Sequence, residues 1–184
     1  AGKPEGPQGL CLNPANTSYT TSGATYASAY QWYIFPEEAG LIFGNGLEAE
    51  VDWENDFTGT AGIIVIGVND CGQGEASDTL FIGIELPPVA NAGDDQVIVY
   101  QSSTQLLGSA SGGSGEYSYF WEPSELLVDP AQAQSQTLEL TQSVQFTLTV
   151  TDLVSGCFAN DQMVVTVTGG PLYVDALAEP EEIC

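Results

Sequence analysis

Basic side chains are almost absent from this sequence. It has no histidine and no arginine, and Lys3 is its only basic residue against 25 Asp and Glu, which gives a formal net charge of −24. Without an imidazole base, a Ser-His-Asp or Cys-His catalytic site cannot be built. Without a basic surface, nucleic acids and anionic membranes are excluded as partners, because binding to either depends on lysine and arginine.

Long apolar runs are absent as well. No stretch reaches the roughly 18 apolar residues of a membrane-spanning helix, so we expect no direct membrane insertion. Hydrophobic residues still make up 43% of the chain, which is enough to build buried cores and too many for a disordered protein. A pair of carboxylates is the kind of catalytic site that this composition still permits. Because no such pair stands out, we predict that the protein is not an enzyme.

Short segments rich in β-branched and aromatic residues recur along the chain, and clusters of glycine, asparagine and aspartate separate them. This pattern, with no helical periodicity, is typical of an all-β sandwich. The stretch from Phe146 to Thr151 alternates between apolar residues and threonine, as expected for a half-exposed antiparallel strand. The other expected strands cover residues 17–21, 29–35, 47–53, 62–69, 79–85, 97–100, 103–109, 118–121, 136–140 and 161–168.

An aromatic strand that ends at a proline occurs twice, as Tyr30–Pro36 and as Tyr117–Pro123. Trp121 of the second copy follows Trp32 of the first by 89 positions. An internal period of this length indicates two repeats of one fold. The sequence therefore predicts two tandem Ig-like antiparallel β-sandwiches.

The domain organisation follows from this period. We expect one sandwich at residues 1–87 and another at 88–169, because the two prolines of Leu86–Val89 stiffen the chain and remove strand hydrogen-bond donors. Residues 170–184 resemble the start of a further repeat. Such a strand, lacking its own sandwich, could act as a donor strand that completes a neighbouring copy. The residues predicted for this donor strand are Leu172, Val174 and Ala176.

Several motifs resemble one known family. Tyr-x-Trp in a middle strand is followed by Val-Asn-Asp-Cys-Gly at 68–72 and by Val-Thr-Asp-x-x-x-Gly-Cys at 150–157, and the second half opens with Val-Ala-Asn-Ala-Gly-Asp-Asp-Gln at 89–96. These motifs resemble the Ig-like PKD (polycystic kidney disease) repeats of secreted and cell-surface proteins of Bacteroidota. The Trp-Asp-Phe-Gly-Asp-Gly motif of better-known members is replaced by Trp-Glu-Pro at 121–123. The resemblance implies a PKD-type sandwich, export, and a role in stalks, adhesins, filaments or polysaccharide-degrading enzymes.

The strand pattern also predicts which side chains face the core. Trp32 and Trp121 hold the place of the core tryptophan of an Ig-like sandwich, so we expect both to be buried. Alternation around Trp32 predicts a second apolar surface on the outside of the first sandwich. We expect a neighbouring domain, another copy or a ligand to cover it, and we favour protein contact. The residues predicted for this surface are Tyr33, Phe35, Ile63, Val65 and Phe81.

Four cysteines indicate an oxidising compartment. Cys11 and Cys71 lie at the start and in the late turn of the first repeat, and we expect them to pair and to close a loop of about sixty residues. Cys157 and Cys184 would then form a second pair, or Cys184 would bond to another molecule. Four cysteines allow three connectivities, and the sequence alone does not choose among them.

Calcium is the cofactor that such an acidic surface attracts most readily. The resemblance implies a calcium site at the junction of the repeats, with Asn91, Asp94, Asp95 and Asp152 as candidate ligands. The alternative is a solvated acidic surface.

Two short motifs predict glycosylation. Asn16 begins an Asn-Thr-Ser sequon, and Thr79 lies in an Asp-Thr-Leu sequence that is similar to the O-glycosylation motif of Bacteroidota.

These predictions favour a non-catalytic extracellular module, structural or adhesive, within a cell-surface fibre, stalk or filament assembled from Ig-like repeats. The alternative is a carbohydrate-binding or spacer module of a secreted polysaccharide-processing enzyme. The expected partners are other copies or neighbouring repeats of the same protein, followed by glycans.

Overall fold

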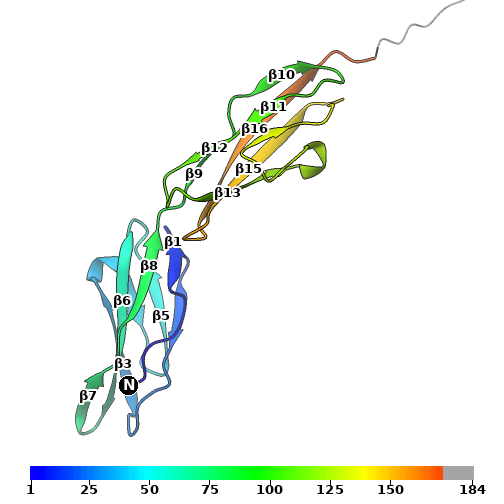
Figure 1. Ribbon diagram of the computed structural model, residues 1–184. Helices are drawn as coiled ribbons and strands as arrows, with labels where there is room; N and C mark the ends of the chain where they lie inside the picture. Colours follow the sequence, from blue (N-terminus) through cyan, green and yellow to red (C-terminus); the bar gives the residue numbers. More distant parts are fainter. Residues whose placement is uncertain (172–184) are drawn as a thin grey trace, which may run out of the picture. The chain divides into compact units, whose positions relative to one another are not determined.

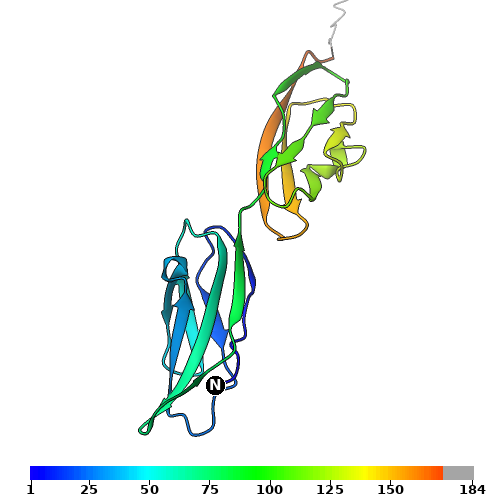
Figure 2. The same cartoon turned by 60° about the vertical axis from the view of Figure 1, so that its left-hand side comes forward.

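The computed structural model describes residues 1–171 of the chain (Figure 1). It is built of strands, and the two helical segments in this range are single 3-10 turns at Glu37–Ala39 and Ser124–Leu126. Within these residues, no helix is long and apolar enough to cross a membrane. The predicted all-β fold with two tandem Ig-like sandwiches is confirmed (Figures 1 and 2).

The first sandwich contains eight strands in two sheets. One sheet has the order β1-β8-β6-β3, with β7 paired to the rest of β6, and the other has the order β2-β5-β4. One pair, β1 with β8, is parallel. The strands are β1 (Gly9–Cys11), β2 (Thr17–Thr20), β3 (Ala29–Phe35), β4 (Gly40–Phe43), β5 (Glu48–Trp53), β6 (Gly59–Asn69), β7 (Gly72–Ala76) and β8 (Leu80–Glu85).

Alternating side chains from both of these sheets build the first core. In β5, every second residue is buried, so Ala49, Val51 and Trp53 point inward while the acidic residues between them face solvent. Trp53 packs edge-to-face on buried Tyr19 of β2, with ring centroids 6.4 Å apart. Trp32 is buried as predicted, and its indole N–H donates to the carbonyl oxygen of Gly46.

The second sandwich has a four-stranded sheet of order β10-β16-β15-β13 and two short two-stranded sheets, β11-β14 and β12-β9. The pairing of β10 with β16 is parallel. The strands are β9 (Val89–Asn91), β10 (Gln96–Val99), β11 (Gln105–Leu107), β12 (Ser109–Ser111), β13 (Tyr117–Glu122), β14 (Gln134–Gln136), β15 (Val144–Asp152) and β16 (Phe158–Thr168).

Its core again follows the predicted alternation. Phe146, Leu148 and Val150 of β15 are fully buried, while the threonines between them are half-buried on the other face. Trp121 is also fully buried, as predicted. Its indole N–H is shared between the carbonyl oxygens of Gln132 and Ala133, so the core tryptophan has no unsatisfied donor.

The two sandwiches repeat the same local order around their tryptophans. A proline follows the last residue of both β3 and β13, namely Pro36 and Pro123, and each proline leads into a 3-10 turn. Both prolines follow a cis peptide bond. This order agrees with the alignment of Tyr30–Pro36 and Tyr117–Pro123 that the sequence predicts.

The chain divides into two compact units, and two segments of its second half belong to the first unit. The first unit comprises Ala1–Ala90, Ala110–Tyr119 and Thr149–Asn160, and the second comprises Asn91–Ser109, Phe120–Leu148 and the described residues from Asp161 onward. The domain boundaries at 1–87 and 88–169 stay a prediction. The predicted further repeat at 170–184 lies outside the described residues, apart from its first two.

Candidate functional site

The outer face of the five-stranded sheet carries a cluster of aromatic residues. Phe35 of β3 and Phe81 of β8 are both paired with Gly62 of β6, so the two rings lie on either side of this glycine. Tyr33 lies on the same face, two positions from Phe35. Tyr33, Phe35 and Phe81 are 43%, 41% and 60% exposed. We call this surface the aromatic face, and it consists of Gln31, Tyr33, Phe35, Gly62, Ile64, Ile66 and Phe81.

The predicted surface was partly wrong, because Ile63 and Val65 are fully buried. Val65 is paired with core-facing Trp32, and residues paired across two antiparallel strands share one face of the sheet. The outward positions of β6 are therefore Ile64 and Ile66, and the prediction for this strand was shifted by one residue. Tyr33, Phe35 and Phe81 are exposed as predicted.

The Phe35 ring packs directly on the backbone at Gly62. A Cβ atom at position 62 would lie 2.3 Å from Cε2 and 2.4 Å from Cζ of Phe35, so the ring occupies the space above the glycine. The methyl carbon of Thr79 would lie 3.0 Å from the same Cβ and borders this space. Phe35 thus lies across the sheet and rests on backbone, which fixes the ring while leaving it partly open to solvent.

Polar groups border the aromatic rings. The Oε1 atom of Gln31 accepts a hydrogen bond from the Tyr33 hydroxyl (2.9 Å) and another from Nε2 of Gln73 (2.7 Å). These two bonds hold the Gln31 carboxamide in one orientation. Its own NH₂ group has no hydrogen-bond partner among the described residues, so it can donate to a bound molecule.

No residue of the aromatic face is charged, although the chain has a formal net charge of −24. Acidic residues alternate with core positions on the opposite sheet, as in β5. The aromatic face is therefore an uncharged region on a strongly anionic protein.

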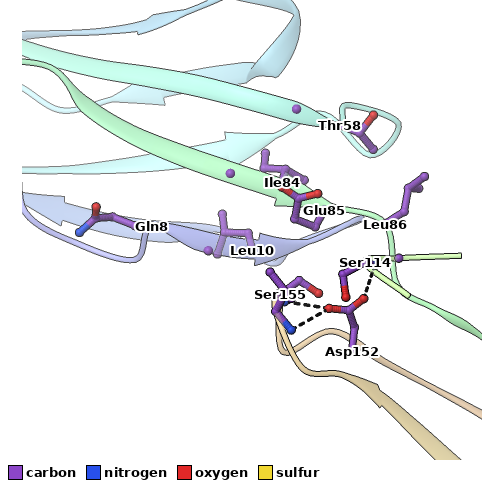
Figure 3. A pocket seen from close by; sticks show the side chains of 14 residues that line it. Gln8, Leu10, Thr58, Ile84, Glu85, Leu86, Ser114, Asp152 and Ser155 are labelled. Atoms are coloured by element: carbon purple, nitrogen blue, oxygen red, sulfur yellow. Dashed lines mark hydrogen bonds between the residues drawn. The ribbon is translucent and has the colours of Figure 1, made fainter. Parts of the chain in front are cut away.

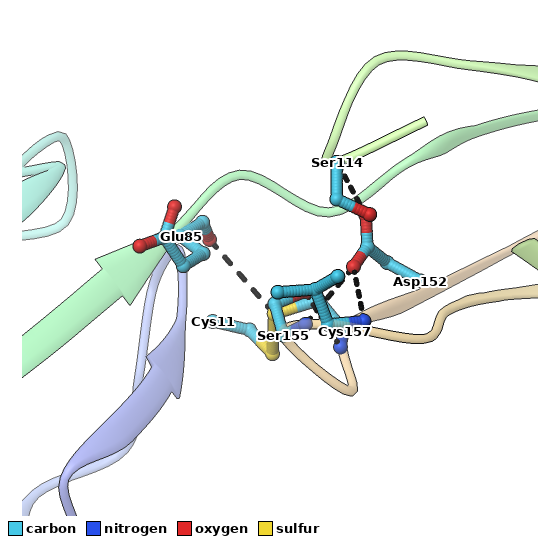
Figure 4. Close-up of a disulfide and its surroundings, with 7 residues drawn as sticks. Cys11, Glu85, Ser114, Asp152, Ser155 and Cys157 are labelled. Carbon is cyan, nitrogen blue, oxygen red and sulfur yellow. Dashed lines mark hydrogen bonds between the residues drawn. A yellow bond between two sulfur atoms is a disulfide. The ribbon is translucent and has the colours of Figure 1, made fainter. Parts of the chain in front are cut away.

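A disulfide joins Cys11 at the end of β1 to Cys157, the residue immediately before β16, with a Cα–Cα distance of 5.6 Å (Figure 4). Both cysteines belong to the first compact unit. They are 146 positions apart in sequence, so this bond encloses most of the chain in one covalent loop.

The predicted Cys11–Cys71 pair is therefore wrong. Cys11 is paired with Glu85, at the end of the sheet where β6 begins, whereas Cys71 follows the last residue of β6. A strand of this length spans about 35 Å, far beyond the 4.4–6.8 Å between Cα atoms that a disulfide tolerates. Cys71 is exposed and has no disulfide partner among residues 1–171. Cys184 lies outside the described residues.

Asp152 organises the turn that precedes Cys157. Its Oδ1 atom accepts hydrogen bonds from the backbone N–H groups of Val154 (3.0 Å) and Ser155 (2.9 Å), and Oδ2 accepts from the N–H of Ser114 (Figure 3). The N–H groups of Ser155 and Ser114 hold the pKa of this carboxyl well below its usual range, because they stabilise its charged form. Gly113 permits the approach, since a Cβ there would lie 2.3 Å from Oδ2.

A cavity of about 600 Å³ lies next to this turn, and all of its lining residues belong to the first unit (Figure 3). Leu10 and Ile84 contribute apolar surface to it, while Ser155 and Asp152 contribute polar atoms. Both oxygens of Asp152 already accept backbone hydrogen bonds, so this carboxylate of the cavity holds the turn in place.

The candidate calcium ligands do not form a cluster. No group of three or more acidic, cysteine or histidine side chains suited to a metal ion occurs in the described part of the chain. Asn91 and Asp95 instead accept backbone hydrogen bonds from Gly93 and Val164. Calcium binding stays a prediction.

The remaining predicted sites are on the surface or outside the described range. Asn16 is exposed and donates to a Glu50 carboxylate oxygen, and Thr79 is half-buried beside the aromatic face. Glycosylation at both stays a prediction. The donor-strand residues Leu172, Val174 and Ala176 lie outside the described residues.

Two features of the site were missed from sequence. The packing of Phe35 on Gly62 depends on the register between β3 and β6, which the apolar run of β6 does not reveal. The role of Asp152 in the turn was predicted as calcium binding, although an aspartate shortly before Ser155 and Gly156 is a turn signal that could have indicated it.

Comparisons with known proteins support an Ig-like fold. Residues 1–82 match the sequence model of the PKD-like domain family. The search of curated proteins found no match. Among solved structures, a C-terminal 282-residue fragment of intimin, in complex with the intimin-binding domain of its receptor Tir, is 14% identical with a TM-score of 0.56, and the match covers 89% of this chain and 62% of that one. Extracellular domains 3–5 of Drosophila OTK are 13% identical with a TM-score of 0.50, over 89% of this chain and 59% of that one.

The chain thus spans less than two thirds of each of these structures, and at such low identity they show the fold alone. Together with the PKD-like match over residues 1–82, they identify the protein as a tandem of Ig-like domains.

Proposed function

We propose that the protein is a non-catalytic extracellular structural module, which forms one segment of a cell-surface fibre, stalk or filament built from Ig-like repeats. Its tandem sandwiches and the PKD-like match over residues 1–82 support a structural module. The absence of histidine and arginine from the whole sequence supports a role without catalysis.

The Cys11–Cys157 disulfide supports an extracellular location, because such bonds persist in oxidising compartments. The single lysine and the absence of arginine also leave trypsin-like proteases with almost no cleavage site. Both features suit a protein that is exposed to extracellular proteases.

The disulfide is also the observation that carries the structural role. It joins two positions that are 146 apart in sequence, so strands of both sandwiches lie within one covalent loop. When the chain is pulled from its two ends, only the residues outside the loop can extend without reduction of this bond. A segment whose maximum length is fixed covalently suits a fibre or stalk under tension.

Assembly with other copies would use the segment from Leu172 as a donor strand. We expect the oxidised protein to form end-to-end chains in negative-stain microscopy and multi-angle light scattering, and a variant truncated after residue 169 to stay monomeric. A synthetic peptide of residues 170–184 should block assembly of the full-length protein. Full-length protein that stays monomeric, with residues 170–184 open to proteolysis, would contradict assembly through this segment.

A further inference from the structure

We propose that the aromatic face binds a neutral, extended polysaccharide of the β-1,4-glucan type. Tyr33, Phe35 and Phe81 would supply the stacking surface, and the carboxamides of Gln31 and Gln73 would supply hydrogen bonds to the sugar hydroxyl groups. This binding site goes beyond the structural role and does not depend on it.

The three aromatic rings supply the flat apolar surface on which such a ligand would stack. A sugar whose hydroxyl groups are all equatorial presents C–H groups on its flat faces, and these faces pack on aromatic rings much as nucleobases do. Phe35 lies across Gly62 with part of its surface open, while Tyr33 and Phe81 are exposed beside it. Because the three rings project from one sheet face, they suit an extended chain better than a single sugar in a closed pocket.

The carboxamides at the edge of the aromatic face supply the hydrogen bonds that would orient such a ligand. A neutral sugar has no charge to anchor it, so its orientation depends on hydrogen bonds at the edge of the stacked ring. The Tyr33 hydroxyl and the Gln73 carboxamide both donate to Gln31, and this leaves the Gln31 NH₂ group fixed in place and free to donate. A donor that is already oriented loses little conformational entropy when it binds.

Charge selects the class of polysaccharide. The net charge of −24 repels uronic acids and sulfated sugars at low ionic strength. The aromatic face has no carboxylate that could hold the ammonium group of an amino sugar. A neutral glycan is therefore the ligand that matches both the face and its surroundings.

Size favours a glycan over a protein partner. From Gln31 to Phe35 the face is about 13 Å long, and three adjacent strands are about 10 Å across, which gives an area on the order of 130 Å². Stable protein complexes bury about 800 Å² on each partner. The corresponding face of the second sandwich is also different, because Ser118 and Glu122 flank Phe120 on β13, and the outward residues of β15 are polar. The aromatic face is thus not a general feature of the repeat.

Isothermal titration of the whole oxidised protein with cellohexaose tests the proposal. We expect saturable binding, and a loss of affinity of about tenfold or more for Tyr33→Ala and for Phe35→Ala, because each removes one stacking ring. Phe120→Ala is the matched control, since Phe120 is 45% exposed on the equivalent strand of the other sandwich. It should bind like the unchanged protein, and polygalacturonate should not bind to any variant.

Gly62→Ala provides a second variant that keeps all three rings. Its new methyl group must displace the Phe35 ring, which can swing toward solvent, so we expect the melting temperature to stay nearly constant while affinity falls. No binding of cellohexaose by the unchanged protein, or equal binding by all variants, would overturn the proposal. Self-association that Phe35→Ala abolishes, without any glycan binding, would overturn it in favour of protein contact.

Discussion

Asp152 shows how one carboxylate can hold a turn together. Backbone N–H groups from Ser114, Val154 and Ser155 all point at its two oxygens, and Gly113 leaves room for the approach. Because the turn leads directly to Cys157, this carboxylate also places the cysteine that bonds with Cys11. A residue that was predicted to bind calcium therefore has a structural role.

Replacing Asp152 by asparagine should destabilise the protein. One oxygen becomes an NH₂ group, which cannot accept a hydrogen bond from Ser114 or from the turn, so at least one part-buried N–H loses its partner. We expect a clear fall in the melting temperature at pH 7, measured by circular dichroism. Asp129→Asn is the control, since that carboxylate accepts one exposed hydrogen bond from Ala131.

The effect of Asp152→Asn should also depend on pH. The pKa of Asp152 is lowered in the folded protein, so its stabilising contribution is complete above the ordinary carboxyl pKa of about 4 and is lost as the pH falls below that value. The difference in melting temperature between the two proteins should therefore shrink as the pH is lowered from 4. A difference that grows on acidification would contradict this role.

Among the strands, β15 was predictable from sequence and β6 was not. In β15, threonine alternates with apolar residues, so one face is marked as the core. In β6, Ile63 to Ile66 are all apolar, and a run without alternation fits either register. The pairing of Trp32 with Val65 fixes the register of β6, and this pairing is a tertiary contact that the sequence of β6 alone does not reveal.

The disulfide was unpredictable for the same reason. The sequence predicts that Cys11 pairs with Cys71 because both lie in one repeat, but β6 separates them by its full length. The observed partner, Cys157, comes from a turn in the other half of the sequence. Spacing along the chain carries no information on which turns lie at the same end of a sheet.

At the level of elements, Gly108 shows how closely the segment after β11 packs on the main sheet of the second sandwich. A Cβ there would lie 2.6 Å from the carbonyl oxygen of Ala133, 2.8 Å from Trp121 and 2.9 Å from Leu148. We expect Gly108→Ala to lower the free energy of unfolding by about 1–3 kcal/mol, the usual cost of overpacking. Gly46→Ala, where the space is open, is the control for chemical denaturation. Equal stability of the two variants would refute this packing.

For the whole molecule, the net charge of −24 is a source of self-repulsion. Because salt screens interactions between exposed charges, the melting temperature should rise when potassium chloride is increased from about 0.01 M to about 0.15 M, a range over which the Debye length falls from about 30 to about 8 Å. Sucrose at equal osmolality controls for solute effects that do not involve charge. A melting temperature that falls with salt would indicate that attractive ion pairs dominate instead.

Force spectroscopy with handles at both ends tests directly whether the Cys11–Cys157 bond fixes the length of a structural module. In the oxidised protein, only residues outside the loop from Cys11 to Cys157 should extend, which gives a contour length of about 13 nm at about 3.5 Å per residue. Reduction of the disulfide should add about 50 nm to this contour length. The Cys71→Ser variant should behave like the unchanged protein. A gain of about 21 nm would indicate the Cys11–Cys71 pair instead, and no gain would show that the loop is not closed.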